Sequence, residues 1–279
     1  MQTRHITGRA ARRVQPGGGN PHSGLRTHTL IDDRIEPGAT SSAGIVSGRT
    51  PREQADRILA TILNATGPIV LCMPGTLGPA WQSSIYETAR LIAHERAGAG
   101  PITIVSIPYK NRVADAVKRA IRIGTDPSES TLALVLQGIE QYGNGRPVYL
   151  LGESQGSWVI AHDLQDPKLA RVVTRVVMYA KPGIQRSPAA VGAQATGKGA
   201  RSSNQILEIR HTDDIVPSLF SKIGMDVIHG YALAFRRLFA THDFEYTPHH
   251  YDAHAADGAA FLLHGIRPAN TVHPSSDDR

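Results

Sequence analysis

The sequence predicts an α/β protein with a doubly wound, mostly parallel central sheet flanked by helices. Short, almost continuously apolar segments alternate with longer segments in which apolar residues recur every three or four positions. Strands that are covered on both faces appear as continuous apolar runs, whereas helices packed on one side show the helical period. A length of 279 residues is enough for one large domain with appendages.

The elements up to residue 151 follow this alternation. We expect a helix over 52–65, a strand over 69–73, a helix over 86–96, a strand over 102–107, helices over 113–123 and 131–142, and a strand over 148–151. In the first helix Ile58 and Ile62 share one face, and Gly67-Pro68 ends it before the first strand.

The rest of the chain continues the pattern after a break. We expect a helix over 157–164, strands over 172–179 and 206–209, and a helix over 252–263. The domain organisation that follows is a flexible leader over 1–50, one α/β domain over 51–267 and a polar tail over 268–279. Within the domain, 184–204 is expected to be a mobile loop and 218–246 a helical insertion near the site.

Composition excludes several classes of protein. No apolar run approaches the roughly 20 residues that a membrane-spanning helix needs, and the first 20 residues lack the apolar stretch of a signal peptide. Cys72, the single cysteine, excludes an intrachain disulfide and is expected to be a buried, inert thiol. The net charge of +6 comes without an aromatic-interleaved basic motif, so specific nucleic-acid binding is not expected.

The most informative motif is Gly152-Glu153-Ser154-Gln155-Gly156, which lies between an expected strand and an expected helix. Gly-x-Ser-x-Gly in this context is typical of a nucleophile elbow, where a sharp turn exposes the serine hydroxyl. Glycines on either side allow the crowded turn to form. A plain surface turn is the alternative interpretation, and the flanking strand and helix disfavour it. The motif predicts Ser154 as a catalytic nucleophile.

A serine nucleophile needs a base to accept its proton and an acid to orient that base. In α/β hydrolases the order along the chain is serine, acid, histidine. The expected strand over 206–209 leads to Asp213 and Asp214. Asp214 is preferred as the acid because the apolar residues after it can pack the loop, and Asp213 is the second choice.

Histidines gather near the end of the chain, and His249 and His250 directly precede the last expected helix. His249 is the first choice as the base and His250 the second, whereas His242, His254 and His264 are expected to be surface or packing residues. The histidine-rich stretch HDFEYTPHHYDAH is also a candidate zinc site. It contains no HExxH helix, and the ordered triad explains one histidine without metal, so no metal and no cofactor are expected.

The oxyanion of an acyl transfer needs two hydrogen-bond donors. The backbone N–H of Gln155, next to the serine, is one candidate. The other should come from a loop after an early strand, where Gly75 and Thr76 follow the strand over 69–73. Thr76 can offer both its N–H and its hydroxyl. The alternative is that PGTLGP is only a tight turn.

With these segments the chain resembles the cutinase-like serine esterases, and among them the lysin B enzymes of mycobacteriophages, over about residues 65–265. The resemblance rests on the elbow GESQG, the segment VVMYAKPG, the acid loop HTDD, and PHHY before the last helix. It implies an α/β-hydrolase fold with Ser154, Asp214 and His249 as the triad and Thr76 with Gln155 as oxyanion donors. The chain departs from secreted cutinases in having neither disulfide cysteines nor a visible signal peptide.

The resemblance also implies a function. A lysin B hydrolyses the ester that joins mycolic acids to arabinogalactan and so detaches the outer layer of the actinobacterial envelope during phage lysis. The expected partners are a lipid or mycolyl ester and the cell-envelope surface, reached after release of a monomer made in the cytoplasm without a signal peptide. The alternatives are a cutinase-like lipid or polyester carboxylesterase of cellular origin and a non-catalytic cell-wall-binding module with a hydrolase fold.

Overall fold

The protein is described by a computed structural model that covers residues 28–30, 50–75, 84–96, 100–109, 130–182, 187–188, 191–192, 205–211 and 251–268. The helix expected over 113–123 and the insertion over 218–246 lie outside the described residues. The first elements are β1 (His28–Leu30), α1 (Pro51–Asn64), β2 (Ile69–Met73), α2 (Ser84–Glu95), β3 (Thr103–Ser106) and α4 (Thr131–Tyr142). They are followed by β4 (Val148–Glu153), α5 (Gln155–Asp163), α6 (Pro167–Val172), β5 (Arg175–Tyr179), β6 (Ile206–Ile209), the 3-10 helix η6 (Asp252–His254) and α9 (Ala255–His264).

The strands form one sheet in the order β1-β3-β2-β4-β5-β6, and every neighbouring pair is parallel. From β2 the chain moves to β3 on one side, then crosses to β4 on the other side and continues outward to β5 and β6. The expected doubly wound α/β fold is therefore confirmed. The order reverses between β2 and β4, and ligands of such sheets bind outside the carboxyl ends of the strands at this reversal.

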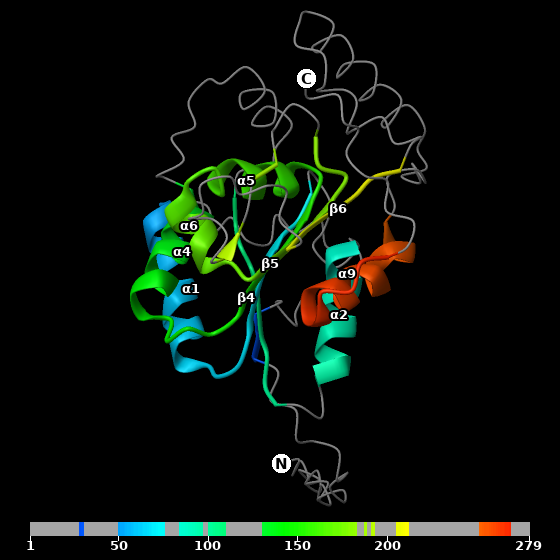
Figure 1. Cartoon of the computed structure of the whole chain (residues 1–279). Coiled ribbons are helices and arrows are strands. Elements are labelled where there is room, and N and C mark those ends of the chain that lie inside the picture. Colours follow the sequence, from blue (N-terminus) through cyan, green and yellow to red (C-terminus); the bar gives the residue numbers. More distant parts are fainter. Residues whose placement is uncertain are drawn as a thin grey trace, which may run out of the picture.

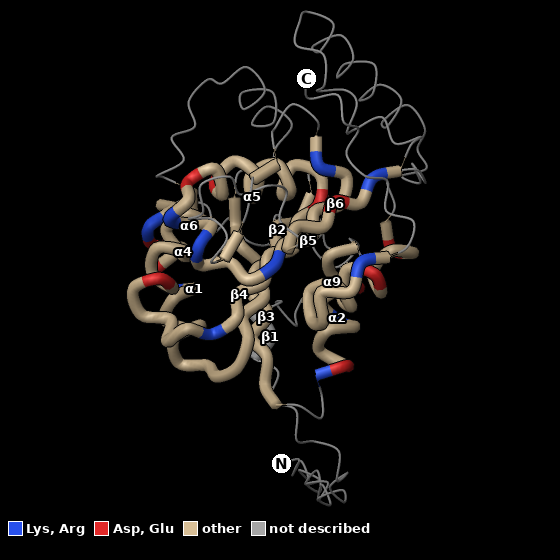
Figure 2. The backbone as a smooth tube through the Cα atoms, in the orientation of Figure 1, with Lys and Arg blue, Asp and Glu red and all other residues tan. Residues whose placement is uncertain are grey.

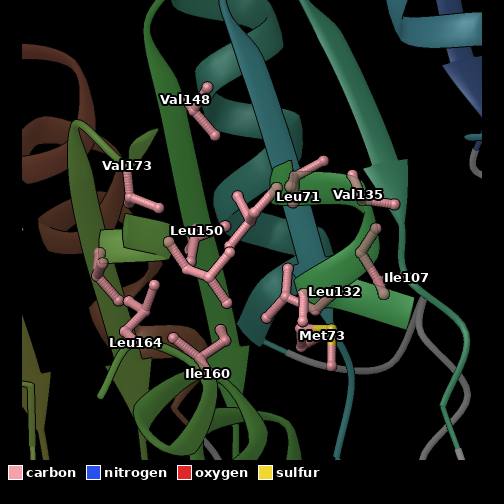
Figure 3. Close-up of a cluster of buried hydrophobic side chains, with 14 of the residues drawn as sticks. Leu71, Met73, Ile107, Leu132, Val135, Val148, Leu150, Ile160, Leu164 and Val173 are labelled. Carbon is pink, nitrogen blue, oxygen red and sulfur yellow. The ribbon is translucent and has the colours of Figure 1, made fainter. Parts of the chain in front are cut away.

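Helices cover both faces of the sheet, as Figure 1 shows, with α1, α4, α5 and α6 on one side and α2 and α9 on the other. Because side chains alternate along each strand, the core is divided into a first layer under α1, α4, α5 and α6 and a second layer under α2 and α9. On β4, Leu150 faces the first layer and Tyr149 the second. Figure 3 shows the first layer, in which aliphatic side chains such as Leu71, Leu150 and Ile160 pack together. Each fully buried side chain of this size contributes about 1.5–3 kcal/mol.

Helix α1 shows how local sequence sets an element's ends. The Thr50 hydroxyl accepts the N–H of Glu53, and the Glu53 carboxylate accepts the N–H of Thr50, which completes a capping box. At the other end, the Arg146 guanidinium donates to the carbonyls of Ile62 and Ala65 at 2.9 and 2.7 Å. The Ile62 carbonyl also accepts the N–H of Ala65 at 3.2 Å, so Arg146 adds to the bonds at this helix end and ties α1 to the start of β4.

Two features differ from the sequence prediction. Residues Pro167–Val172 form α6, so the strand expected over 172–179 begins only at Arg175. The reason is local: the Asp166 carboxylate accepts the N–H of Lys168, and Pro167 occupies the first turn. Residues His28–Leu30, inside the expected leader, form edge strand β1 beside β3. A segment of three residues is too short to show the alternation of a strand in its sequence, and it becomes a strand by pairing with β3.

Only residues 187, 188, 191 and 192 of the loop expected over 184–204 are described, so its mobility stays a prediction. Its described residues pack against the sheet, because Val191 is fully buried in the first layer and the Ser187 hydroxyl donates to Glu208 on β6.

Figure 2 shows that charged residues lie mainly on helices and connections, and β2 and β3 carry none. Among the described residues, no helix is both long and apolar enough to cross a membrane.

Candidate active site

Ser154 occupies the turn between β4 and α5 that the sequence predicted. Its φ and ψ of 50° and −119° are values that a residue with a side chain adopts only at a cost of about 1–3 kcal/mol. The surroundings impose this conformation: the Ser154 N–H donates to the carbonyl of Tyr179 at 2.9 Å, and the Ser154 carbonyl accepts the N–H of Trp158 at 3.1 Å. The serine is thus held between the neighbouring strand β5 and the first turn of α5.

The two glycines of the motif are required by close packing. A Cβ on Gly156 would lie 2.0 Å from the carbonyl oxygen of Met73, at the end of β2. A Cβ on Gly152 would lie 2.9 Å from the Cα of Ser157 and 2.7 Å from the Cδ1 of Ile160. All three distances are shorter than ordinary contacts between such atoms, so the elbow needs glycine on both sides of Ser154. The surface-turn interpretation is wrong, because the motif is buried where strand and helix meet.

The end of β2 lies beside the serine, as the expected oxyanion loop requires. A Cβ on Gly75 would lie 3.4 Å from the Cβ of Ser154. The Tyr109 hydroxyl, beyond β3, donates to the carbonyl of Pro74 and holds this segment. Thr76 is the next residue along the chain and lies outside the described residues, so its role stays a prediction.

Gln155 is the first residue of α5 and is 2% exposed. At the start of a helix the backbone N–H groups point along the axis, and this end carries the positive side of the helix dipole. A negative charge that develops on a ligand beside Ser154 would therefore be stabilised. The carboxyl ends of β2 and β4, where the strand order reverses, carry Gly75 and Ser154, so this site occupies the position at which doubly wound sheets bind ligands.

The acid and base candidates Asp213, Asp214, His249 and His250 lie outside the described residues, so their roles stay predictions. The residues that flank them along the chain are described and touch each other. The Tyr251 hydroxyl accepts the backbone N–H of His211 at 3.0 Å. Their rings stack with centroids 4.1 Å apart and an interplanar angle of 19°. This contact brings the chain before Asp213 next to the chain after His250.

A buried ionic cluster at the ends of β5 and β6 was not predicted. The Lys181 ammonium, 2% exposed, lies 4.0 Å from the Glu208 carboxylate, which also pairs with Arg210. Burial lowers the pKa of Lys181 from 10.5 to about 8, Glu208 raises it in part, and Arg210 lowers it. The sequence does show one charged residue in each of two apolar segments, Lys181 in YAKPG and Glu208 in ILEI. That these two residues lie side by side follows only from the pairing of β5 with β6.

The remaining titratable candidates have structural roles. The His254 Nδ1 lies 3.1 Å from the Asp257 carboxylate, and His264 pairs with Glu95, in line with the expectation that these are surface or packing histidines. Cys72 is buried, and burial raises its pKa to about 12, which makes it an inert thiol as predicted. Within the described part of the chain, no three His, Cys, Asp or Glu side chains form a group that could hold a metal ion.

Comparison with solved structures finds several similar chains. The chain is similar to a cutinase from Trichoderma reesei, solved in complex with a C11Y4 phosphonate inhibitor, with a TM-score of 0.46 and 16% sequence identity. The similarity covers 76% of this chain and 85% of that chain. No protein-family model matches the sequence, and no curated protein matches it.

Proposed function

We propose that this chain is a serine esterase in which Ser154 attacks the carbonyl carbon of an ester. The observation that carries the proposal is the conformation of Ser154: a residue other than glycine is held at φ 50° where a strand meets a helix. The strain supports the proposal together with its surroundings. A nucleophile gains from this geometry, since the turn presents its hydroxyl at the start of α5, beside Gly75 and at the reversal of the strand order.

The proposed mechanism gives each residue one task. His249 takes the proton of Ser154 as the hydroxyl oxygen bonds to the ester carbon, and Asp214 stabilises the resulting imidazolium. The N–H of Gln155 and Thr76 stabilise the oxyanion. His249 then protonates the departing alcohol, and a water molecule, activated in the same way, releases the acid. His250 and Asp213 are the second choices. The mechanism uses no metal or cofactor.

For the substrate we propose the mycolic acid–arabinogalactan ester of the actinobacterial envelope, with the chain acting as a lysin B during phage lysis. The sequence resemblance in the elbow, the acid loop and PHHY supports this substrate. The enzyme would be made in the cytoplasm and act as a monomer on the envelope surface after release. A cutinase-like carboxylesterase of cellular origin has the same triad and a different acyl group. A non-catalytic cell-wall-binding module would keep the fold without the activity.

A fluorophosphonate probe tests the nucleophile. We expect it to label Ser154 in the wild-type protein, and we expect Ser154→Ala to lose labelling and to lower p-nitrophenyl ester hydrolysis by several orders of magnitude. Ser157→Ala is the matched control, because Ser157 lies on the next turn and donates to the Tyr179 carbonyl at 2.9 Å. That variant should lose some thermal stability and keep the label. Full activity of Ser154→Ala would refute the proposal.

The substrate is tested separately. Incubation with mycolyl-arabinogalactan-peptidoglycan should release free mycolic acids, and Ser154→Ala should release none. Hydrolysis of p-nitrophenyl esters should persist at long acyl lengths and be unaffected by chelator. A sharp preference for acetate without release of mycolic acids would favour the cellular carboxylesterase. No hydrolysis of any ester would favour the non-catalytic module.

A further inference from the structure

Tyr251 joins three parts of the site that are far apart in the sequence. It is fully buried at the start of η6, directly after His249 and His250. Its hydroxyl accepts the backbone N–H of His211, a residue 40 positions earlier, at 3.0 Å, and its ring stacks on the His211 ring. The ring also contacts that of Tyr179 on β5, with centroids 5.9 Å apart and planes tilted by 49°.

Tyr179 continues the connection to the nucleophile. Its carbonyl accepts the N–H of Ser154 at 2.9 Å, so the backbone of β5 directly holds the elbow. Its hydroxyl lies 2.8 Å from the Thr88 hydroxyl on α2 and 3.2 Å from the carbonyl of His254 in η6. Ser154, Tyr179, Tyr251 and His211 thus form an unbroken series of contacts that links the elbow to the two segments beside the acid and base candidates.

The Tyr251 hydroxyl is not needed for packing. A phenylalanine would fill the same volume and stack on the same histidine ring, but it could not accept the hydrogen bond from the His211 backbone. That bond acts on the main chain two residues before Asp213 and three before Asp214. Side-chain bonds to a backbone fix the position of a loop and leave its side chains available for chemistry.

We infer that Tyr251 is a positioning residue, whose hydroxyl fixes the backbone of His211 and thereby sets the acid-bearing segment in register with the base-bearing segment. The inference rests on the proposed esterase function. It identifies a residue that acts on the triad through the backbone, without itself touching the substrate.

The test is Tyr251→Phe in the full chain, read out by activity and by hydrogen exchange. With p-nitrophenyl butyrate we expect kcat to fall on the order of tenfold with KM changed less than about twofold, because misplacing catalytic groups affects the chemical step. We expect the His211 amide, followed by NMR, to exchange on the order of tenfold faster once its acceptor is lost. Tyr149→Phe is the matched control, since Tyr149 is also a buried tyrosine, on β4. It should change neither quantity by more than about twofold.

The two readouts separate the possible failures. Faster exchange with unchanged kcat, or unchanged exchange at His211, overturns the positioning role. An equal loss of kcat in Tyr149→Phe overturns it as well, because the loss would then reflect any buried tyrosine. If the wild-type protein hydrolyses no ester, the proposed function fails and the positioning role with it, while the exchange measurement still shows whether the bond exists.

Discussion

The neighbouring strands β4 and β5 are each followed by a residue with the same positive φ, and they lead to different structures. Ser154 follows β4 with φ of 50°, and Ala180 follows β5 with φ of 49°. Among the described residues, the one other position with positive φ that is not glycine is Asn144. After β4 the chain enters α5 at once, and close packing against the Met73 carbonyl fixes the turn. After β5 and Ala180 comes Lys181, buried beside Glu208.

The difference shows what a strained backbone does and does not indicate. At Ala180 the positive φ carries no reactive group, and the position serves the turn between the strand and a buried ion pair. At Ser154 the same angle lifts a hydroxyl to the start of a helix, beside a glycine of the adjacent strand end. Strain marks a reactive site only in combination with such surroundings. The turn at the end of β4 packs closely against the Met73 carbonyl, whereas the turn at the end of β5 leads to the buried ion pair of Lys181 and Glu208.

The largest expected effect tests the packing at the end of β4. We expect Gly156→Ala to lower the free energy of unfolding by about 3 kcal/mol or more, because the new Cβ would lie 2.0 Å from a backbone oxygen that cannot move freely. Urea denaturation measures this. Gly145→Ala is the control: its φ of 68° is strained, but no atom lies within 4 Å of the new Cβ. It should cost about 1 kcal/mol. Equal costs would mean that packing does not fix the elbow.

A smaller effect tests whether the two strained residues differ in function. We expect Ala180→Gly to change the free energy of unfolding by less than about 0.5 kcal/mol, since relief of strain offsets the lost methyl burial and the entropy of glycine. Ala133→Gly, at a buried position within α4, should cost about 1 kcal/mol. Ala180→Gly should keep ester hydrolysis, whereas Ser154→Gly should abolish it. Loss of ester hydrolysis in Ala180→Gly would show that the residue after β5 is needed for activity as well, and that Ser154 and Ala180 do not differ in this respect.

A further prediction tests the charge at the end of β5. Because burial lowers the pKa of Lys181 from 10.5 to about 8, the unfolded chain binds more protons than the folded chain between these pH values. Stability contributed by this group therefore rises with pH through 8, by about 1 kcal/mol between pH 7 and pH 9. Chemical denaturation of the wild type and of Lys181→Met at both pH values measures it. The variant should lack this rise, and groups common to both proteins cancel. An identical pH dependence in both would show that Lys181 does not titrate in this range.

Features determined by local sequence could be predicted. The elbow is one, since its two glycines and the strand and helix beside them lie within a few residues of Ser154. The ends of α1 are another, because Thr50 and Glu53 cap each other. The pair Lys181 and Glu208 could not be found in this way, because it depends on the register of two strands separated by 26 residues. The contact of Tyr251 with His211 depends on tertiary structure in the same way.

The bond from the Ser154 N–H to the Tyr179 carbonyl, together with the Met73 carbonyl beside Gly156, has a consequence for assembly. The elbow receives support from a strand made long before it and from one made after it. A nascent chain that ends between residues 160 and 175 contains the whole motif but lacks β5, so nothing on that side holds the serine at positive φ. Ser154 therefore acquires its full set of backbone contacts only after β5 has been made and has paired with β4, and a product truncated before β5 lacks the bond to the Tyr179 carbonyl.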